Sequence, residues 1–315
     1  MLVSPVVVAN PSVDTMGNLS EKSAQIYLMK SSISVMEGPE GVDHLNNILS
    51  TNLVSLREGM RMDGLICDSN GKVADVVNCY NMGQSILIIG MGSNTASTRE
   101  LLTRGIPWDK KLSLLDGNGA LEHLKIIGQD SRSLVENIYP ELSKLSENTF
   151  SEFENVLFSI STHNEHEIVD IIVRRDNSDF YGRIEMCNHK ISKTEDWDFA
   201  RMTVGYPGPN EVNGEYLPHD IGMLKLISLD KGCYPGQEIH ARLDSRSKPK
   251  KRLVIMTTSD FMEIGKHSLS DGGSIKITSS AVRDGSHLSM GVCSVEVSPD
   301  AKLVNYNGES KLILL

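Results

Sequence analysis

The sequence predicts an α+β protein built from more than one structural unit. Its 315 residues are enough for two or three units of ordinary domain size. Before Leu253, short apolar stretches of strand-like composition alternate with short stretches of helical periodicity. From Leu253 onward, short β-type segments are separated by Gly and Asp without a helical pattern, which is typical of a small all-β module.

The first elements form a strand, a turn and a short helix. Residues 32–36 are predicted to be a strand, and a turn at 38–40 leads into the helix. One face of that helix carries Val42, Leu45, Ile48 and Leu49. Because these side chains recur at helical spacing, they predict a helix packed on a sheet.

A hairpin, a further strand and a second helix follow. Strands are expected near 65–67 and 73–80, because Asn70-Gly71 between them favours the left-handed backbone of a hairpin turn. Another strand is expected at 86–89. The next helix should begin after Asn94 as its N-cap and run through Arg104 to the terminating Gly105.

A weak internal repeat predicts a second unit related to the first. Residues 128–138 follow an apolar strand in the same way as residues 38–48 do. Strands of this second unit are expected at 156–161, 168–174 and 180–186, and a helix at 197–204.

The charge balance is negative overall but not uniform. There are 31 Lys and Arg against 41 Asp and Glu, a net charge of −10, which argues against wholesale binding of nucleic acid. Between Arg201 and Arg252, however, nine basic residues face six acidic ones. This local excess of positive charge points to a small or localised anion.

Composition also indicates where the protein works. No apolar run approaches the roughly 20 residues that cross a bilayer, so no membrane segment is expected. The apolar residues 2–8 have no basic region ahead of them, which argues against a secretory signal and favours the cytoplasm. Five widely spaced cysteines without a Cys-x-x-Cys pair support neither a disulfide framework nor a zinc site.

The stretch from Lys231 to Arg242 is the most informative in the chain. Two glycines and a proline within it force a turn, so Cys233 and Tyr234 are expected on a rigid loop. A loop cysteine between Lys231 and His240 favours a reactive thiolate, and the alternative is a buried structural cysteine. Gln237 and Glu238 either contact a ligand that approaches the loop or form the start of a helix or strand.

A basic cluster follows directly. Its members are Arg242, Arg246, Lys248, Lys250, Lys251 and Arg252. Such a run is either solvated surface or a site for a phosphate backbone or a ligand carboxylate, since both anions need spaced, exposed cations.

Three motifs occur in a fixed order and together resemble one family. They are Arg201-x-x-x-Gly205-x-Pro207, then Leu217-Pro218-x-Asp220, then Lys231-Gly-Cys-Tyr-x-Gly-Gln-Glu through Arg242. This set is similar to the YgfZ family, which comprises folate-binding relatives of the glycine cleavage T-protein, an aminomethyltransferase. The helix region 41–52 and residues 291–294 resemble the same family more loosely.

The resemblance implies two interlocked α+β subdomains over residues 1–245 and a small C-terminal β-barrel over 246–315. These would surround a pocket for tetrahydrofolate or a one-carbon derivative. It also implies an accessory role in iron–sulfur cluster assembly or repair, with iron–sulfur client enzymes or assembly factors as partners. A single loop cysteine does not supply the four ligands that a bound cluster takes, so no metal site is expected.

Site residues carry over from the same motifs. The resemblance implies Cys233 as the reactive thiol, with Lys231 beside it and Asp75 as a further catalytic candidate. The residues it implies for cofactor binding are Arg201, Tyr234, Gly236, Gln237, Glu238 and Arg242. For the amino edge of the pterin we expect an acidic partner, either Asp179 or Glu185.

The chain also departs from the T-protein pattern. T-proteins carry an Asp-Asp pair where this chain has Ala74-Asp75, and the early helix ends in Thr51-Asn52-Leu53 instead of Thr-Asn-Asp. One carboxylate of the pair is therefore missing. An aminomethyltransferase is accordingly the second hypothesis, and a protein that contacts or helps to modify tRNA through the basic cluster is the third.

Overall fold

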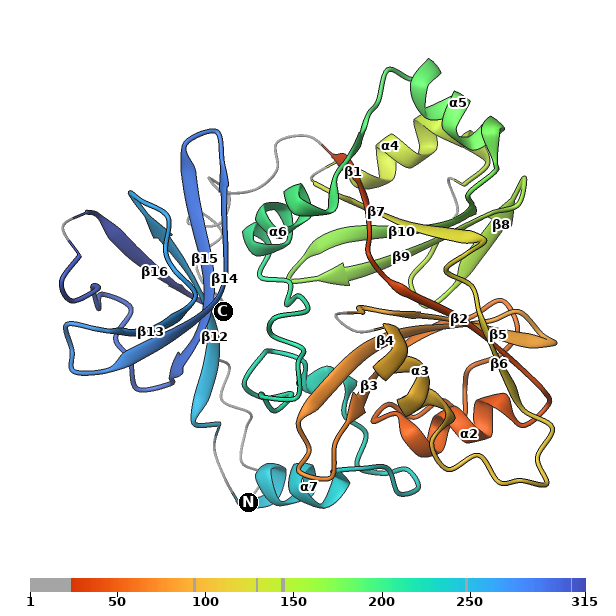
Figure 1. Ribbon diagram of the computed structural model, residues 1–315, viewed down its shortest axis with the longest axis horizontal. Helices are drawn as coiled ribbons and strands as arrows, with labels where there is room; N and C mark the ends of the chain where they lie inside the picture. Colours follow the sequence, from red (N-terminus) through yellow and green to blue (C-terminus); the bar gives the residue numbers. More distant parts are fainter. Residues whose placement is uncertain (1–23, 93–94, 129, 143–144, 247–248, 307) are drawn as a thin grey trace, which may run out of the picture.

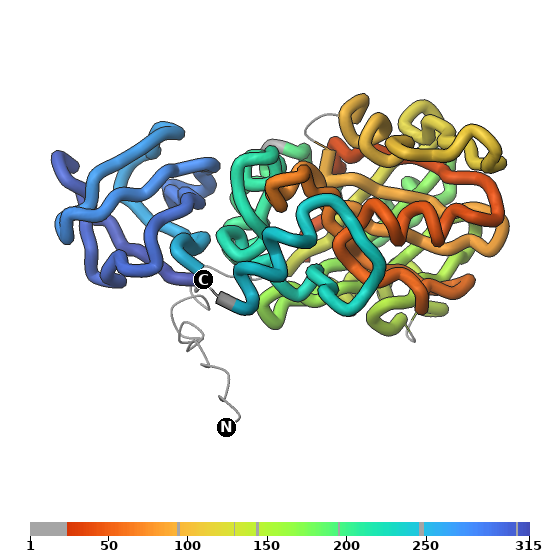
Figure 2. The backbone as a smooth tube through the Cα atoms, turned by 90° about the horizontal axis from the view of Figure 1, so that it is seen from below, coloured from red at the N-terminus to blue at the C-terminus, as the bar shows by residue number. Residues whose placement is uncertain are grey.

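Three sheets organise the chain in the computed structural model, which describes residues 24–92, 95–128, 130–142, 145–246, 249–306 and 308–315 (Figure 1). Two of the sheets face each other (Figure 1), and the third forms a separate lobe beside them (Figure 2). The described helices have at most ten residues, so none of them could span a bilayer.

The first sheet contains the predicted hairpin. Its order is β3 (Arg61–Cys67), β4 (Val73–Asn81), β5 (Ser85–Gly90), β2 (Ser32–Glu37) and β6 (Ser113–Asp116), all antiparallel. Two helices, α2 (Gly41–Ile48) and α3 (Thr95–Thr103), cover its outer face through Leu45, Ile48 and Leu102. Gly105 has the expected positive φ, whereas the N-cap predicted at Asn94 lies outside the described residues.

The second sheet is built in the same way. Its order is β11 (Ile191–Ser192), β1 (Gln25–Leu28), β7 (Leu121–Ile127), β10 (His166–Arg174), β9 (Val156–His163) and β8 (Phe150–Phe153). The helices α4 (Ser131–Ile138) and α5 (Ser178–Met186) pack on its outer face, and a short 3₁₀ turn (Pro140–Leu142) follows α4.

One predicted strand is wrong, because residues 180–186 belong to α5. The side chain of Asn177 accepts a hydrogen bond from the Phe180 amide at 3.0 Å and so caps the helix. Phe180 and Ile184 are one helical turn apart, and both are buried against the second sheet. Apolar spacing in this short segment fits both periods, and the cap decides in favour of the helix.

The two units are interlocked, as expected. Strand β1 lies in the second sheet, next to β7, while β2 begins only a few residues later in the first sheet. The chain therefore crosses between the sheets at Met29–Ser31. Helices lie outside both sheets, and the two inner faces meet around Ile33, Tyr80 and Ile172.

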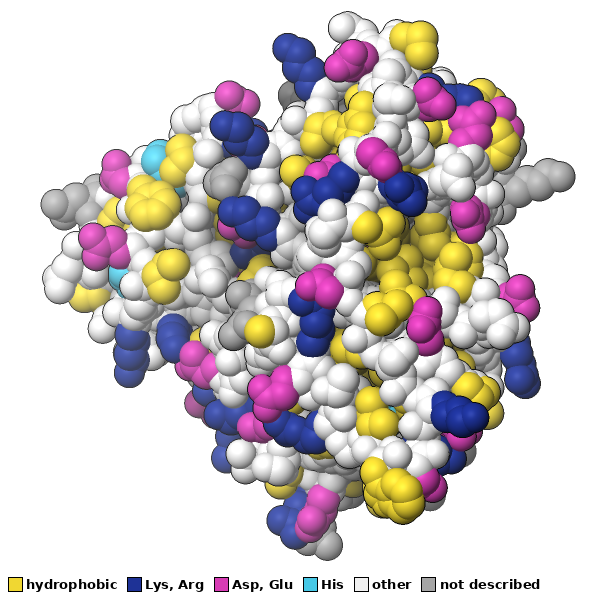
Figure 3. Space-filling model, turned by 45° about the vertical axis from the view of Figure 1, so that its right-hand side comes forward, with side chains coloured by type: hydrophobic (Ala, Val, Ile, Leu, Met, Phe, Trp, Pro, Cys, Tyr) yellow, Lys and Arg dark blue, Asp and Glu magenta, His cyan; other side chains and the backbone are white. Residues whose placement is uncertain are grey.

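At the edge where the two sheets open to the surface there is an apolar groove (Figure 3). Its apolar lining consists of Val35, Met82, Leu87, Leu121, Leu157 and Ile172.

The C-terminal module is all β, but its sheet does not close into the predicted barrel. Its order is β13 (Gly265–Ser268), β14 (Ser274–Arg283), β15 (Ser286–Ser294), β12 (Lys251–Thr258) and β16 (Ser310–Leu314), and no ladder of the described residues joins β13 to β16. On β12, Leu253 and Ile255 face the rest of the protein, whereas Val254 and Met256 face the module's own core. Because both faces are already covered, the sheet needs no closure to bury its apolar side chains.

The segment between the second and third sheets fills the space between the units. It contains α6 (Thr194–Thr203), the 3₁₀ turn Leu224–Leu226 and α7 (Gln237–Arg246). Phe199, Met202 and Tyr216 from this segment pack between the first and third sheets. The predicted boundary at residue 245 stays a prediction; β12 begins at Lys251.

Candidate functional site

The signature loop, residues 231–236, carries the motif that resembles the YgfZ family, and it is fixed to the first sheet. The ammonium group of Lys231 donates to three carbonyl oxygens at the end of α2, those of Asn46, Leu49 and Thr51, the last two at 2.8 Å. The last carbonyls of a helix have no partner within the helix, so Lys231 acts as a C-terminal cap. Burial lowers the pKa of Lys231 to about 8.

A second contact ties the same loop to the β3–β4 hairpin. Gly236 lies against Gly71, and a Cβ on Gly236 would come within 2.5 Å of the Gly71 Cα. His240 donates from Nε2 to the Gly71 carbonyl at 2.8 Å, and its Nδ1 accepts from the Tyr234 hydroxyl at 3.2 Å. Burial lowers the pKa of His240, in keeping with a neutral ring that has one donor and one acceptor nitrogen.

Cys233 is exposed on this loop. Cys67, Cys79 and Cys293 are buried, and Cys187 is half-buried. The two side chains expected to favour the Cys233 thiolate are bonded elsewhere, since Lys231 caps α2 and His240 joins Tyr234 to Gly71. Lys231 and His240 therefore hold the loop in place, and Cys233 faces solvent instead of being a buried structural cysteine. Its role as a reactive thiol stays a prediction.

The other residues carried over from the motifs lie on two helices, with Gln237, Glu238 and Arg242 on α7 and Arg201 on α6. Gln237 donates from Nε2 to the Lys231 carbonyl at 3.3 Å and begins α7, on which Glu238 and Arg242 form an exposed i,i+4 ion pair of 2.5 Å. Arg201 is fully buried on α6. Their roles in cofactor binding stay predictions.

Arg201 connects α6 to the third sheet. Its guanidinium donates to Asp198 at 2.6 Å, to Glu211 at 3.0 Å and to Ser279 of β14 at 2.7 Å. Glu211 in turn accepts from the Gly208 amide. Every guanidinium nitrogen has a protein partner, so Arg201 holds the units together.

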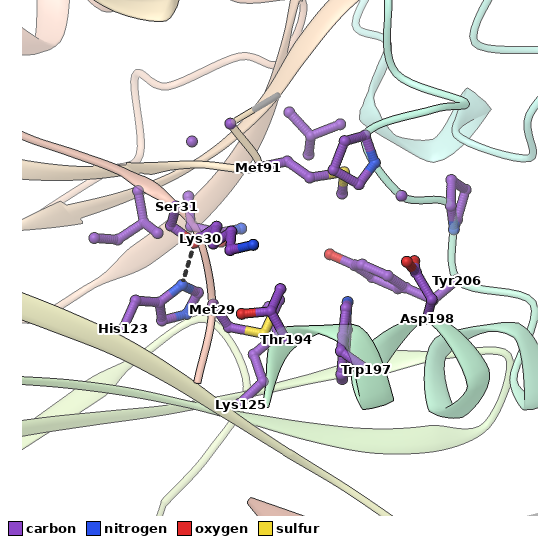
Figure 4. Close-up of a pocket in the computed structure, with 18 residues that line it drawn as sticks. Met29, Lys30, Ser31, Met91, His123, Lys125, Thr194, Trp197, Asp198 and Tyr206 are labelled. Atoms are coloured by element: carbon purple, nitrogen blue, oxygen red, sulfur yellow. Dashed lines mark hydrogen bonds between the residues drawn. The ribbon is translucent and has the colours of Figure 1, made fainter. Parts of the chain in front are cut away.

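A cavity of about 250 Å³ lies where the two facing sheets meet α6 (Figure 4). Lys30, Ser31 and His123 stand on one side of it, and Asp198 and Tyr206 stand on the other. The remaining lining residues are Met29, Val76, Asn78, Ile89, Gly90, Met91, Gly92, Lys125, Thr194, Trp197, Pro207, Gly208 and Pro209. Cys233 and Asp75 are not among them.

The walls of this cavity combine aromatic faces with charge. Trp197 and Tyr206 lie edge to face with ring centroids 6.1 Å apart. The Asp198 side chain is 44% exposed, although one of its oxygens accepts from Arg201. The Lys125 ammonium lies 5.7 Å from the Tyr206 ring centroid. Such a site can hold a flat heterocycle and pair a carboxylate with its N–H groups.

A buried ionic cluster lies behind the cavity, between the two sheets. The fully buried carboxylate of Asp170 accepts from Lys125, from His123 at 2.9 Å and from Arg61 at 3.4 Å. Burial would raise the pKa of Asp170, but these neighbours outweigh it and hold the pKa well below its usual range. Arg61 also pairs with Asp63 at 3.0 Å. No sequence motif marks this cluster, because its members come from three strands.

Asp75 lies directly behind the cavity wall. Its carboxylate accepts from the Thr98 hydroxyl at 2.5 Å, from the Val76 amide at 2.7 Å and from the Gly92 amide at 3.5 Å. Burial nevertheless raises the pKa of Asp75 above its ordinary value. Asp75 thus anchors Gly92, which lines the cavity, while Asp179 and Glu185 lie on α5, outside the cavity lining.

The fold is similar to that of a solved aminomethyltransferase. The aminomethyltransferase T of the glycine cleavage system from Bartonella henselae superposes with a TM-score of 0.73 at 13% identity, covering 96% of this chain and 87% of that one. The predicted T-protein-like fold is therefore confirmed, apart from the open third sheet.

Sequence comparison identifies a narrower group of similar proteins. The protein named tRNA-modifying protein YgfZ from Photobacterium profundum is 22% identical over 75% of this chain and 70% of its own length. The YgfZ of Escherichia coli O7:K1 is 21% identical over 72% of this chain. A chloroplastic protein of Arabidopsis thaliana is 24% identical, and the match spans only 58% of that protein. No protein-family model matches the chain. The resemblance to YgfZ proteins predicted from the sequence is confirmed.

Proposed function

We propose that this chain is a tetrahydrofolate-binding accessory protein of iron–sulfur enzyme assembly or repair. The observation that carries the proposal is the cavity beside α6, together with a fold shared with an aminomethyltransferase. In the proposal the pterin ring lies by Trp197 and Tyr206, Asp198 accepts from its amino edge, and Lys30 faces the carboxylate tail. A volume of about 250 Å³ suits the ring system, with the tail leading outward.

Intrinsic fluorescence offers a direct test of folate binding. The chain has two tryptophans, of which Trp197 lines the cavity and Trp108 is 98% exposed. In the W108F variant, Trp197 is the sole tryptophan reporter, and tetrahydrofolate should change its emission in a saturable way at micromolar concentration. A flat titration at that concentration would refute folate binding in this cavity.

A matched pair of variants locates the ligand. D198N should weaken binding about 10-fold or more, because a hydrogen bond to a charged group contributes about 1.5–3 kcal/mol. D196N changes an exposed carboxylate on the same helix that does not line the cavity, and it should bind as W108F does. Melting curves of both variants control for the loss of the Asp198–Arg201 pair.

Substitution of Cys233 tests the accessory role separately from folate binding. In a host that lacks the corresponding activity, C233A should fail to restore iron–sulfur enzyme activity. C187A changes the other cysteine that is not buried and should restore it. Full rescue by C233A would refute a thiol-dependent role without bearing on folate binding.

A transferase function is supported less well. Aminomethyl transfer needs a carboxylate at the reacting carbon. Asp75 is buried behind the cavity wall, with its oxygens bonded to Thr98, Val76 and Gly92. The structure offers no second carboxylate beside it in the position of the T-protein pair, since residue 74 is Ala.

Contact with tRNA is a second candidate, because several relatives carry the name tRNA-modifying protein. Of the predicted basic cluster, Lys250 and Lys251 are exposed, Arg242 pairs with Glu238, and Lys248 lies outside the described residues. Binding to tRNA should weaken steeply between low and physiological salt, and K250Q/K251Q should lower the slope. A flat salt dependence would refute this candidate.

A further inference from the structure

Three side chains from separate parts of the chain form a hydrogen-bonded series that ends at the cavity. Ser31 lies where the chain crosses between the sheets, His123 on β7 and Asp170 on β10. The Ser31 hydroxyl is 2.7 Å from His123 Nδ1, and His123 Nε2 is 2.9 Å from Asp170 Oδ1. All three are buried, and both Ser31 and His123 line the cavity (Figure 4).

The charges around the series determine where the protons lie. Asp170 stays ionised beside Lys125 and Arg61, so it is only an acceptor and His123 Nε2 must carry a hydrogen. Burial lowers the pKa of His123, which keeps the ring neutral and leaves Nδ1 as an acceptor. The Ser31 hydroxyl is therefore the donor to His123.

This order of donors and acceptors has the logic of a serine nucleophile. A hydroxyl that donates to a neutral imidazole can lose its proton to that ring as it attacks, and the carboxylate holds the ring in the required tautomer. Such a constellation is recognised by geometry and roles, not by position in the sequence. Here Nδ1 faces the serine and Nε2 faces the aspartate.

We propose that Ser31 is a nucleophile toward small carboxylic esters or thioesters bound in the cavity, with His123 as general base and Asp170 as the positioning residue. In the first step the Ser31 Oγ bonds to the acyl carbon, and His123 takes the serine proton. The bond to the alcohol or thiol breaks, and that group leaves with the proton from His123. Water then bonds to the acyl carbon as His123 takes its proton. The bond between that carbon and Ser31 Oγ breaks, the carboxylic acid leaves, and His123 returns the proton to Ser31.

The neighbouring cations shape this chemistry. Lys125 lines the same cavity and supplies positive charge for the oxyanion that forms at the carbonyl. Lys125 and Arg61 also oppose a charge on His123, so the proton must pass promptly to the leaving group. The proposed activity goes beyond folate binding and does not require it.

A fluorophosphonate probe tests the nucleophile directly in the full chain. Attack forms a bond from Ser31 Oγ to phosphorus and expels fluoride, while the serine proton passes through His123 to solvent. Mass spectrometry should place one adduct on the peptide that contains Ser31. S31A should remain unlabelled there, and S32A, which changes the adjacent buried serine, should be labelled like the wild type.

Two further measurements make the outcome decisive. H123Q should be labelled about 100-fold more slowly, which is the scale of general-base catalysis, at a temperature where its melting curve shows a folded protein. The wild type should also release about one equivalent of nitrophenolate in a burst from p-nitrophenyl acetate, with the acetyl group mapped to Ser31. An unmodified Ser31 peptide in the wild type, or equal labelling rates in folded H123Q, would overturn the proposal.

Discussion

Gly236 and Gly71 pack backbone against backbone, and this contact fixes the signature loop to the first sheet. Both residues have positive φ angles, of 83° and 76°. A Cβ on Gly236 would meet the Gly71 Cα at 2.5 Å and the Asp68 carbonyl oxygen at 2.7 Å. Backbone atoms cannot move aside as a flexible side chain can, so the contact requires glycine.

The first prediction concerns this contact. G236A should lower the free energy of unfolding by about 2–4 kcal/mol, because it combines overpacking with a left-handed backbone. Urea unfolding measures the change. G232A is the matched control, since a Cβ at Gly232 in the same loop would meet nothing within 4 Å. Similar losses in both variants would contradict the argument.

The second prediction concerns Lys231. K231M should cost about 1–3 kcal/mol of unfolding free energy, because the carbonyls of Asn46, Leu49 and Thr51 would lose their common donor. K250M removes an exposed lysine and should change stability by less than about 0.5 kcal/mol. If the two variants unfold at the same urea concentration, Lys231 does not act as the cap of α2.

The third prediction concerns the buried cluster. D170N should cost about 3–5 kcal/mol at pH 7, because it leaves Lys125 and Arg61 buried without their shared carboxylate. The pKa of Asp170 is lowered in the folded state, so its stabilisation is present above about pH 4 and is lost as the pH falls further.

Acid titration of stability separates this effect from simple misfolding. The wild type should lose more stability than D170N does as the pH falls below about 4. D176N serves as the control because Asp176 forms a solvent-exposed ion pair with Arg174, and its pH curve should follow that of the wild type. Parallel pH curves for the wild type and D170N would contradict the prediction.

The fourth prediction concerns His163, which donates to the Gly205 carbonyl at 3.1 Å and packs edge to face on Tyr206. Burial lowers its pKa to about 4. Because the unfolded histidine binds a proton near pH 6.5, stability should fall as the pH drops from 6.5 toward 4. Through His163 alone, the free energy of unfolding at pH 5 should be lower than at neutral pH by at most about 2 kcal/mol.

H163Q isolates that contribution, since the other histidines remain in both proteins. Its unfolding free energy should change less than that of the wild type between pH 8 and pH 5, as measured by urea unfolding at each pH. An equal fall in both proteins would show that His163 is not the group responsible.

Local patterns were reliable where one period or one turn determined the element. The Asn70-Gly71 hairpin, the helix with Leu45 and Ile48, and the all-β tail follow from short-range rules, and each is present. The segment 180–186 failed because its apolar spacing suits a strand as well as a helix, and the Asn177 cap decides between them. Closure of the third sheet also could not be read from the pattern, because it depends on which strands pair at the edges.

In the signature loop, too, local features were predictable and long-range contacts were not. Its glycines and proline predicted a turn, which is present, whereas only the structure shows that Cys233 is exposed on it. The roles of Lys231 and Arg201 were not predictable, because each bonds to groups far away in the sequence, at the end of α2 and on β14.

By itself the sequence determined the α+β class, the resemblance to YgfZ proteins and the loop that carries Cys233, because propensities, turn residues and ordered motifs act over a few neighbouring positions. Only the tertiary structure decided that Ser31, His123 and Asp170 meet beside a cavity lined by Trp197. Hydrogen bonds of 2.7–2.9 Å require side chains from separate segments of the chain to converge, and that convergence depends on how the two sheets face each other.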